Sequence, residues 1–222
     1  MTKELMTCAR CPFERAERYC QNEDGQTPSF CPTQNRPEIL QKALEKLDDP
    51  KTREFAIQAA IQEKEGYQLD NGVPVPVKPR LLEIIEFAGK MKYQRLGLAF
   101  CSGLFEEGKA IGKILTDKGF TVISAACKAG KVAKEELGLR SDQKVRPDNF
   151  EPMCNPIFQA MILNDGKSEF NIVLGLCVGH DSLLFKHAEA PCTVLAAKDR
   201  LLGHNPLAAV YNLDSYYGYL KK

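Results

Sequence analysis

The stretch FNIVLGLCVGHD, residues 170–181, carries a thiol, an imidazole and a carboxylate within its last five residues. Its branched apolar run is typical of a strand that is buried on both faces. Glycines on either side of Cys177 allow a sharp turn, so we expect Cys177 to end the strand and His180 and Asp181 to begin the next helix. Because open α/β sheets bind ligands at the carboxyl ends of their strands, this stretch predicts chemistry at that edge.

Three further cysteines are expected around the same sheet. Cys101 and Cys127 each follow an apolar run typical of a strand, and Cys154 precedes a helix that leads into the third strand. The carboxyl ends of parallel strands share one edge, so these thiols are expected to meet that of Cys177. Cys192 begins the fourth strand, which places it at the opposite edge, and we interpret it as a core or surface thiol.

The chemistry expected of Cys101, Cys127, Cys154 and Cys177 is the binding of a metal or an iron–sulfur cluster. Thiolates suit iron–sulfur clusters, zinc and copper(I). The four residues include no CxxC pair, which excludes a zinc ribbon, and a zinc ion with four thiolate ligands has no open position for substrate. These four residues therefore predict a function in redox chemistry or electron transfer. The alternative interpretation is four separate buried thiols, because free cysteine often packs as a small hydrophobe.

Two other hypotheses use the same residues in different ways. In one, no metal is bound and Cys177 acts as a nucleophile, since a position beside a helix N-terminus favours the thiolate. In the other, the protein is not an enzyme, and the thiols hold a metal ion for transfer or sensing. The hypotheses differ in metal content and in the reactivity of Cys177, both of which can be measured.

Charged and imidazole side chains near this edge are the candidate catalytic residues. Lys198 and Arg200 follow the expected fourth strand, and with Lys128 they are candidates to bind a small anionic molecule or a redox partner. A solvated charged loop is the alternative. His180 is a candidate ligand or acid–base group, or a residue that orients the start of the helix. The full catalytic set is His180, Asp181, Lys198, Arg200 and His204, the last of which lies in the predicted turn LGHNP.

The N-terminal segment, residues 1–35, holds a separate group of cysteines. It has few large apolar side chains, and a segment this short normally requires a cross-link or a metal to fold. Cys8 and Cys11 form a CxxC pair, and Cys20 and Cys31 could complete a tetrahedral site. We expect structural zinc here, with an iron–sulfur cluster and unliganded thiols as the alternatives.

The elements that must position these side chains follow from hydrophobic periodicity. Residues 36–93 show the spacing of helices, with an extended connection from Asn71 to Pro79. From residue 94, strand and helix patterns alternate, with strands expected at 95–101, 120–127, 171–176 and 193–197. We predict an α/β fold, a three-layer Rossmann-like domain with a four-stranded parallel sheet in the order 2-1-3-4.

The predicted organisation of the chain has three parts. Residues 1–35 form the Cys-rich metal-binding segment, residues 36–93 a helical segment packed on the core, and residues 94–222 the α/β domain. The charge of the chain is balanced, because 30 basic and 29 acidic side chains leave a net charge of +1. No long basic run is present, so we expect no nucleic-acid partner.

Missing sequence features exclude several other classes of protein. No apolar run is long enough to span a bilayer and the first residues lack the pattern of a signal peptide, so we expect a cytoplasmic protein without a membrane role. Nine cysteines in a reducing compartment favour metal or redox chemistry over disulfides. The sequence has no P-loop, GxGxxG or GxSxG motif, so nothing indicates nucleotide binding or serine-hydrolase chemistry.

Several sequence blocks resemble a known family. FCSGL, MCNPI, GLCVGHDSL, KDRLLGHNP and the closing AxxY are similar to blocks of a prokaryotic family of unknown function, whose members are described as uncharacterised Cys-rich metal-binding proteins and are frequent in anaerobes. The resemblance covers most of residues 36–213 and extends to the N-terminal cysteines with looser spacing. It implies metal binding but no particular reaction. The positions it points to are Cys101, Cys127, Cys154, Cys177, His180, Asp181, Lys198, Asp199, Arg200, His204 and Asn205.

Overall fold

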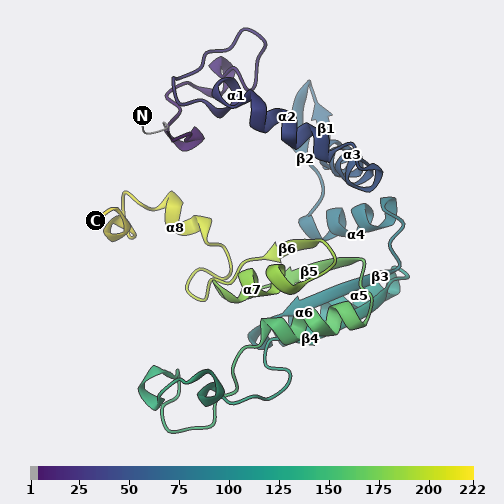
Figure 1. The fold of residues 1–222 in the computed structure, drawn as a ribbon, viewed down its shortest axis with the longest axis vertical. Coiled ribbons are helices and arrows are strands. Elements are labelled where there is room, and N and C mark those ends of the chain that lie inside the picture. The colour runs from purple at the N-terminus through teal and green to yellow at the C-terminus, as the bar shows by residue number, and fades with distance from the viewer. Residues whose placement is uncertain (1–4) are drawn as a thin grey trace. The chain divides into compact units, whose positions relative to one another are not determined.

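The computed structural model describes residues 5–222, and the chain divides into two compact units (Figure 1). One unit reaches to Lys64, and the other runs from Glu65 to Lys222. The boundary lies inside the segment expected to be helical. The position of one unit relative to the other is not determined.

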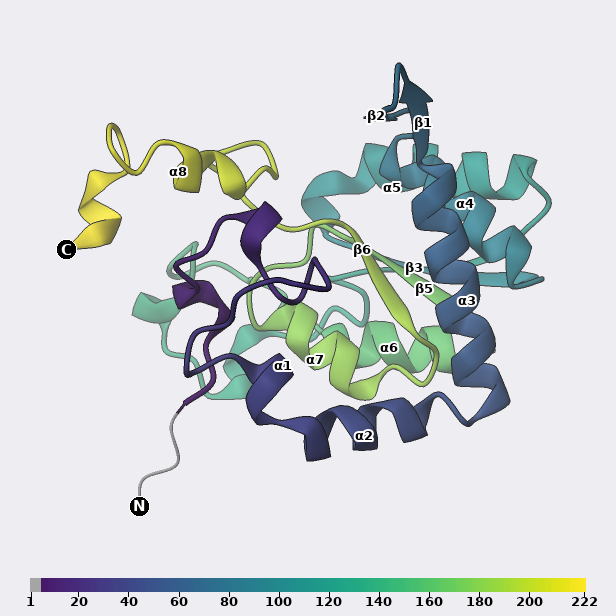
Figure 2. The same ribbon diagram turned by 90° about the horizontal axis from the view of Figure 1, so that it is seen from above.

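The first unit consists of short turns followed by consecutive helices, which Figure 2 shows in purple and blue. Proline stands at the first position of α1 and α2, where its fixed φ favours a helix start and its missing N–H is not needed. Neither of these two helices contains a buried residue. The elements are η1 (Cys8–Arg10), η2 (Arg15–Glu17), α1 (Pro32–Asn35), α2 (Pro37–Lys46) and α3 (Pro50–Glu65).

A β-hairpin opens the second unit, and the sequence prediction missed it. β1 (Tyr67–Asp70) and β2 (Val73–Pro76) pair antiparallel where only an extended connection was expected. Asn71 and Gly72 both have positive φ, 49° and 81°. An Asn-Gly pair supplies the two left-handed residues that a tight hairpin turn requires, and the prediction gave more weight to the prolines that follow.

A four-stranded parallel sheet forms the centre of the second unit, and the expected strand order is confirmed. The order is β4-β3-β5-β6, which is 2-1-3-4 among the strands of this sheet. The two central strands, β3 and β5, are buried along nearly their whole length, whereas β4 and β6 are partly exposed. The strands are β3 (Arg95–Phe100), β4 (Thr121–Ala126), β5 (Phe170–Leu174) and β6 (Cys192–Ala196).

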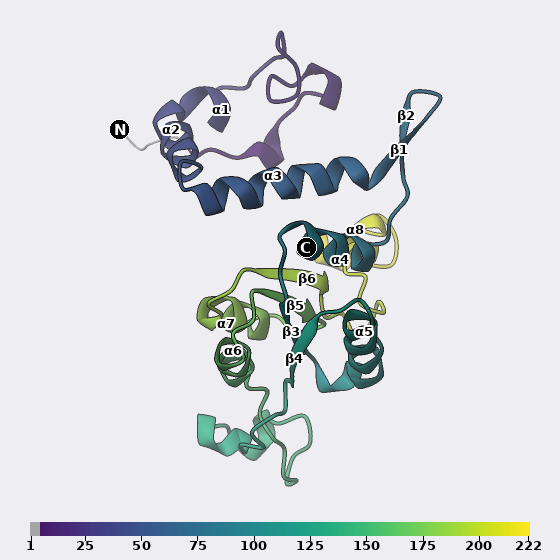
Figure 3. The same cartoon turned by 90° about the vertical axis from the view of Figure 1, so that its right-hand side faces the viewer.

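Helices lie on both faces of this sheet. Figure 3 shows α6 and α7 on one face and α5 on the other. The helix α4 packs against β5 and β6: the rings of Phe87 and Phe170 lie 5.4 Å apart, and Arg80 Nε donates to the carbonyl of Val194 at 2.6 Å. Each fully buried leucine between the layers contributes on the order of 2 kcal/mol by removal of apolar surface from water. The helices are α4 (Arg80–Lys90), α5 (Phe105–Asp117), α6 (Pro156–Asp165) and α7 (His180–His187).

The connection from β4 to α6 is an excursion of irregular chain closed by ion pairs. Lys134 and Glu151 are 2.6 Å apart, and Lys144, which is buried, lies 2.6 Å from Glu135. This connection contains two 3₁₀ turns, η4 (Lys134–Leu137) and η5 (Ser141–Gln143). The N–H of Met153 donates to the carbonyl of Val132 at 2.8 Å. The excursion therefore returns the chain to the sheet edge just before Cys154.

The remaining elements are short. The 3₁₀ turn η3 (Ser102–Leu104) links β3 to α5, and α8 (Leu207–Tyr211) and η6 (Gly218–Lys221) follow β6. Within residues 5–222, no helix has both the length and the apolar character needed to cross a membrane.

Candidate functional site

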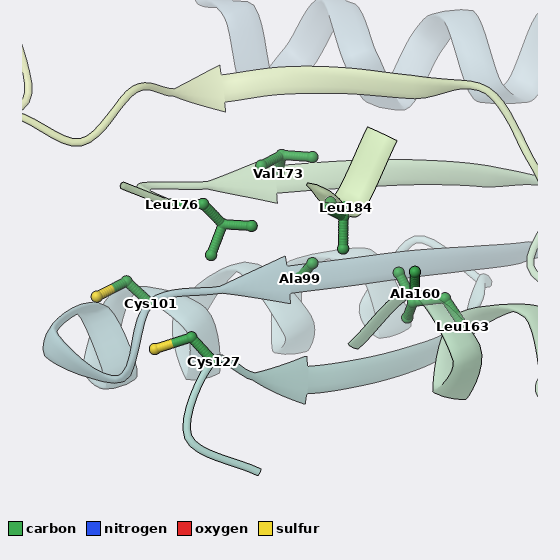
Figure 4. Packing of buried hydrophobic residues seen from close by; sticks show 8 residues of the cluster. All are labelled: Ala99, Cys101, Cys127, Ala160, Leu163, Val173, Leu176 and Leu184. Carbon is green, nitrogen blue, oxygen red and sulfur yellow. The ribbon is translucent and has the colours of Figure 1, made fainter. Parts of the chain in front are cut away.

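Cys101 and Cys127 lie side by side at the carboxyl ends of two neighbouring strands. Phe100 of β3 pairs with Ala126 of β4, so the residues that follow these two stand next to each other. The N–H of Cys127 donates to the carbonyl of Phe100 at 2.8 Å, which continues the ladder by one step. The thiol of Cys127 lies close enough to that of Cys101 to shift its pKa, and Figure 4 shows both sulfur atoms on the same side, beyond the ends of the strands.

Cys154 joins this pair from a third segment of the chain. The N–H of Asn155 donates to the carbonyl of Cys127 at 2.8 Å, which fixes the backbone beside β4. The side chain of Asn155 then caps α6 by accepting a hydrogen bond from the N–H of Phe158 at 2.9 Å. As a result, the sulfur of Cys154 lies close enough to the thiol of Cys127 for its pKa to be lowered, while the Cys127 thiol also donates to Ser102 Oγ at 3.6 Å. We call Cys101, Cys127 and Cys154 the thiol row, with Cys127 in the middle.

A buried glutamine of α6 lies beneath the thiol row. Gln159 is fully buried, and its Nε2 donates to the carbonyls of Phe100 at 3.2 Å and Ala125 at 2.7 Å. It thus joins the ends of β3 and β4 just before their cysteines. Its Oε1 is the buried side-chain N or O atom that lacks a hydrogen-bond partner within residues 5–222. Sequence reasoning missed Gln159, although a lone amide inside the apolar run of a helix was a usable signal.

The two outer thiols of the row have opposite acidities. The hydrogen bond that Cys101 donates to Cys127, together with burial, raises the pKa of Cys101 to about 12. The hydrogen bond from Cys127 is the largest cause that lowers the pKa of Cys154 to about 6, and the charge of Lys128 lowers it further. Proton donation therefore runs from Cys101 through Cys127 to Cys154, which is a thiolate at neutral pH.

Backbone amides add two donors to the sulfur atoms. The N–H of Ser102 points to Cys127 Sγ at 3.3 Å, and the N–H of Gly103 points to Cys101 Sγ at 3.4 Å. Both amides belong to η3, the turn that opens directly after β3. Donors of this kind favour sulfur atoms that carry negative charge.

Cys177 lies at the same edge but has a different partner. It follows β5 after Gly175, whose φ is 62° and whose added Cβ would lie 2.2 Å from Leu104 Cδ1, so only glycine fits there. Arg200 Nη2 donates to Cys177 Sγ at 2.9 Å. A negative charge on Cys177 would act on Cys154 through space, which places the two sulfur atoms near each other.

The other sequence-predicted residues differ in how closely they approach the thiols. Burial is the main cause that lowers the pKa of His180, and the charge of Lys128 lowers it further, so His180 is neutral at pH 7. Asp181 accepts from the N–H of Ser182 at 2.8 Å. Lys198 is hydrogen-bonded to Cys101.

The loop that contains Asp199 and His204 closes mainly on itself. His204 has a φ of 67°, and its Nδ1 accepts from the N–H of Asp199 at 3.1 Å. The carboxylate of Asp199 accepts from the N–H groups of Leu201 and Leu202 at 3.0 and 2.8 Å. These bonds hold the loop after β6 in one shape. The structure shows no bond from His204 or Asp199 to a sulfur atom within the described part of the chain.

Cys192 is far from this edge along its strand. It is the first residue of β6, as expected, and its Sγ accepts from Nδ2 of Asn171 at 3.7 Å. Burial raises the pKa of its thiol. Cys192 is therefore a structural thiol.

The N-terminal cysteines form local turns. The N–H of Cys11 donates to the carbonyl of Cys8 at 3.1 Å, and Cys31 is the N-cap of α1, while Cys8 and Cys20 are exposed. Across residues 5–222, no group of three or more His, Cys, Asp or Glu side chains is arranged so that it could hold a metal ion. This finding covers the N-terminal cysteines and the sheet edge alike.

Comparisons with known proteins identify the family but no activity. Over 185 aligned residues the chain is 40% identical to the uncharacterized protein MJ0455 of Methanocaldococcus jannaschii. The alignment covers 83% of this chain and 88% of that protein. No solved structure matches the chain. The expected uncharacterised prokaryotic family is confirmed, whereas metal binding is named by none of these matches. Because residues 31–195 match the family described as a protein of unknown function (DUF1847), the chain belongs to the DUF1847 family.

Proposed function

We propose that this protein is a thiol-dependent redox protein, and that the thiol row exchanges with disulfides. The observation that supports the proposal is the row of Cys101, Cys127 and Cys154, which come from three separate segments and in which Cys127 shifts the pKa of both outer thiols. A thiolate beside a second thiol is the arrangement that thiol–disulfide exchange requires. We also propose that the helices on both faces of the parallel sheet make this unit a three-layer, Rossmann-like domain.

The first step is attack by the most acidic thiol of the row. Cys154, ionised at neutral pH, attacks one sulfur of a disulfide R–S–S–R′, and the S–S bond breaks as R′–S⁻ leaves. A mixed disulfide then joins Cys154 to R–S. The sequence predicted Cys177 first as a metal or cluster ligand, and only the metal-free alternative had it as the nucleophile. The lowered pKa and the hydrogen bond from Cys127 favour Cys154 instead, and Arg200 already engages Cys177.

The second step uses the central thiol. Cys127 loses its proton to solvent or to neutral His180 and attacks the sulfur of Cys154, so that R–S⁻ leaves and a Cys127–Cys154 disulfide forms. Two protein thiols are thereby oxidised, and one substrate disulfide is reduced to two thiols. A low-molecular-weight thiol or a protein dithiol, running both steps in reverse, returns the protein to its reduced form. Cys101 keeps its proton and orients Cys127 through their hydrogen bond.

A bound metal or iron–sulfur cluster at Cys101, Cys127, Cys154 and Cys177 is the second candidate. The N–H groups of Ser102 and Gly103 favour it, because such donors also surround cluster-bound sulfur atoms. The residues do not fit a metal as they stand, since no ligand group is formed within the described residues. Cys177 Sγ would have to lose its hydrogen bond from Arg200 in order to bind a metal. We derive no reaction step through a metal.

The N-terminal cysteines are a separate proposal, structural zinc at Cys8, Cys11, Cys20 and Cys31. The turn closed between Cys8 and Cys11 resembles half of a zinc knuckle, which supports the proposal. The remaining thiols would have to approach this turn on binding, because no such group is formed in residues 5–222.

Anaerobic purification followed by a metal count and a stepwise thiol assay tests the proposal. Reduced protein without visible absorption should release two thiols from each disulfide that it consumes. Cys127→Ser should stop after one thiol and retain R–S on Cys154, as a mass increase would show. Cys192→Ser is the matched control and should release two. Stoichiometric iron or zinc that is lost in Cys127→Ser but kept in Cys8→Ser would instead establish the metal centre, and an ion readily lost to a chelator would favour a carrier.

A further inference from the structure

We propose that the thiol row takes an anionic low-molecular-weight disulfide, one that carries carboxylates or phosphates near its sulfur atoms. This inference rests on the proposed thiol–disulfide exchange and names its substrate class. It is drawn from three basic side chains around the sulfur atoms, Lys128, Lys198 and Arg200.

The three basic side chains come from two loops at one edge of the sheet, Lys128 from the loop after β4 and Lys198 and Arg200 from the loop after β6. Arg200 Nη2 lies 2.9 Å from Cys177 Sγ. A Cβ added at Gly103 would lie 3.7 Å from Cys101 Sγ and 3.8 Å from Lys198 Nζ, which places Lys198 beside Cys101. The Nζ of Lys128 donates to the carbonyl of Pro152, two residues before Cys154. Each basic group therefore stands next to a different cysteine.

None of these three side chains forms an ion pair with a carboxylate within residues 5–222. Two other lysines, in the connection from β4 to α6, do form ion pairs: Lys134 with Glu151 and Lys144 with Glu135. Asp199, which lies between Lys198 and Arg200, accepts hydrogen bonds from the N–H groups of Leu201 and Leu202, and Asp181 accepts one from the N–H of Ser182. Lys128 acts on Glu151 through space, whereas the ion pair of Glu151 is with Lys134. Within residues 5–222, the positive charge of this edge is therefore not neutralised by a direct ion pair.

Positive charge at this edge has two consequences for a disulfide that carries negative charge. It raises the local concentration of the anion and speeds the encounter, an effect that salt weakens. It also offsets repulsion between the anion and the Cys154 thiolate, which would otherwise slow the attack. A neutral disulfide gains neither effect, and a cationic disulfide is repelled. The rate should therefore follow the charge of the disulfide.

Three disulfides of similar size and different charge test the inference. They are 3,3′-dithiodipropionate, a dianion; bis(2-hydroxyethyl) disulfide, which is neutral; and cystamine, a dication. Thiol release from the full-length reduced protein at pH 7 should be about tenfold faster with the dianion than with the neutral compound, and slowest with the dication. Raising the salt concentration should narrow the differences.

Charge variants connect the preference to the named residues. Arg200→Gln and Lys198→Gln should each reduce the ratio of the dianion rate to the neutral rate by about threefold, whereas Arg200→Lys should keep most of it. Lys186→Gln, on the exposed end of α7, is the matched control for loss of one positive charge and should keep the ratio of the parent protein. Circular dichroism of each variant checks that it has folded.

Two results would overturn the inference in different ways. Equal rates for the three disulfides, or a ratio unchanged in Arg200→Gln and Lys198→Gln, would remove the anionic substrate while leaving thiol–disulfide exchange intact. No reaction with any of the three would remove the exchange and the substrate class together. A faster reaction with the dianion, reduced in Arg200→Gln and Lys198→Gln and kept in Arg200→Lys, would support both the exchange and the anionic substrate.

Discussion

Two groups of cysteines lie in different structural settings within one chain. At the sheet edge, Cys101 and Cys127 follow paired strands, and Cys154 is tied to them through the N–H of Asn155. Before residue 36, Cys8 and Cys11 share one turn, while Cys20 lies in a separate loop and Cys31 at the start of α1. Thiols on a sheet keep fixed distances because the backbone ladder holds them, and thiols in such loops need a ligand to bring them together. The difference predicts reactivity for the first group and a structural role for the second.

Removal of the nucleophile should separate the two groups most clearly. Cys154→Ser is expected to slow reduction of disulfides on the order of a thousandfold, because a hydroxyl does not ionise near neutral pH. Cys20→Ser, in the N-terminal segment, should react at nearly the rate of the parent protein. The measurement is the rate of thiol release with bis(2-hydroxyethyl) disulfide. Similar losses in both variants would show that the two groups act together.

The acidity of Cys154 should appear in its rate of alkylation. In metal-free protein, modification of Cys154 by iodoacetamide should rise through a midpoint near pH 6 and level off above it. Cys127→Ala removes the main hydrogen bond to that sulfur, so the midpoint should move up by one to two pH units, toward the ordinary value of 9.0. The rate of alkylation at pH 6 should then fall roughly ten- to hundredfold. Peptide mapping by mass spectrometry follows the residue, and a midpoint that stays at 6 in Cys127→Ala would contradict the proton order of the row.

The same shift has a consequence for stability. Between pH 6 and 9 the unfolded chain binds a proton at Cys154 that the folded chain does not, so this group adds stability as pH rises and loses it as pH falls through 6. Cys101 acts in the opposite sense, because its raised pKa adds stability below 9 that disappears between 9 and 12.

The buried amide of Gln159 at the sheet edge should contribute more to stability than a glutamine amide in α3. Gln159→Leu removes the donor to the carbonyls of Phe100 and Ala125 and is expected to lower the free energy of unfolding by about 1–3 kcal/mol. Gln58→Leu is the matched change in α3, where the glutamine is only half-buried and its amide donates to Glu54, and should cost less than about 0.5 kcal/mol. Urea denaturation measures both. Equal costs would remove the role given to Gln159.

Treatment with a chelator should have the smallest effect on the sheet edge. If zinc binds Cys8, Cys11, Cys20 and Cys31, its removal should abolish the bound metal and loosen the segment before Lys64. Thiol release by the row should then change by less than about twofold, because no step uses the metal. Cys8→Ser should reproduce the effect of the chelator. A large loss of activity on chelation would instead favour a metal at the edge.

The sequence predicted the frame of the site better than its contacts. Alternating strand and helix patterns predict a parallel sheet, and apolar runs that end at Cys101 and Cys127 predict their place, because register follows from pairing. The choice between Cys154 and Cys177 depends on which sulfur receives a hydrogen bond and which receives Arg200, and no spacing rule encodes that.

Two further features lay outside what periodicity can show. Gln159 matters because two carbonyls from different strands converge on it, a contact between residues up to 59 positions apart. The hairpin at Asn71 and Gly72 was missed because a two-residue turn signal was outweighed by the prolines around it. For the N-terminal cysteines, the CxxC spacing fixes one turn but sets no distance to Cys20 or Cys31.

The first disulfide formed in the reduced, metal-free, full-length protein tests the central claim most directly. One equivalent of 3,3′-dithiodipropionate is added, free thiols are blocked at acidic pH, and the linked peptides are identified by mass spectrometry. Thiol exchange at the row predicts a bond between Cys127 and Cys154. A first bond among Cys8, Cys11, Cys20 and Cys31, with Cys127 and Cys154 both still free, would contradict it.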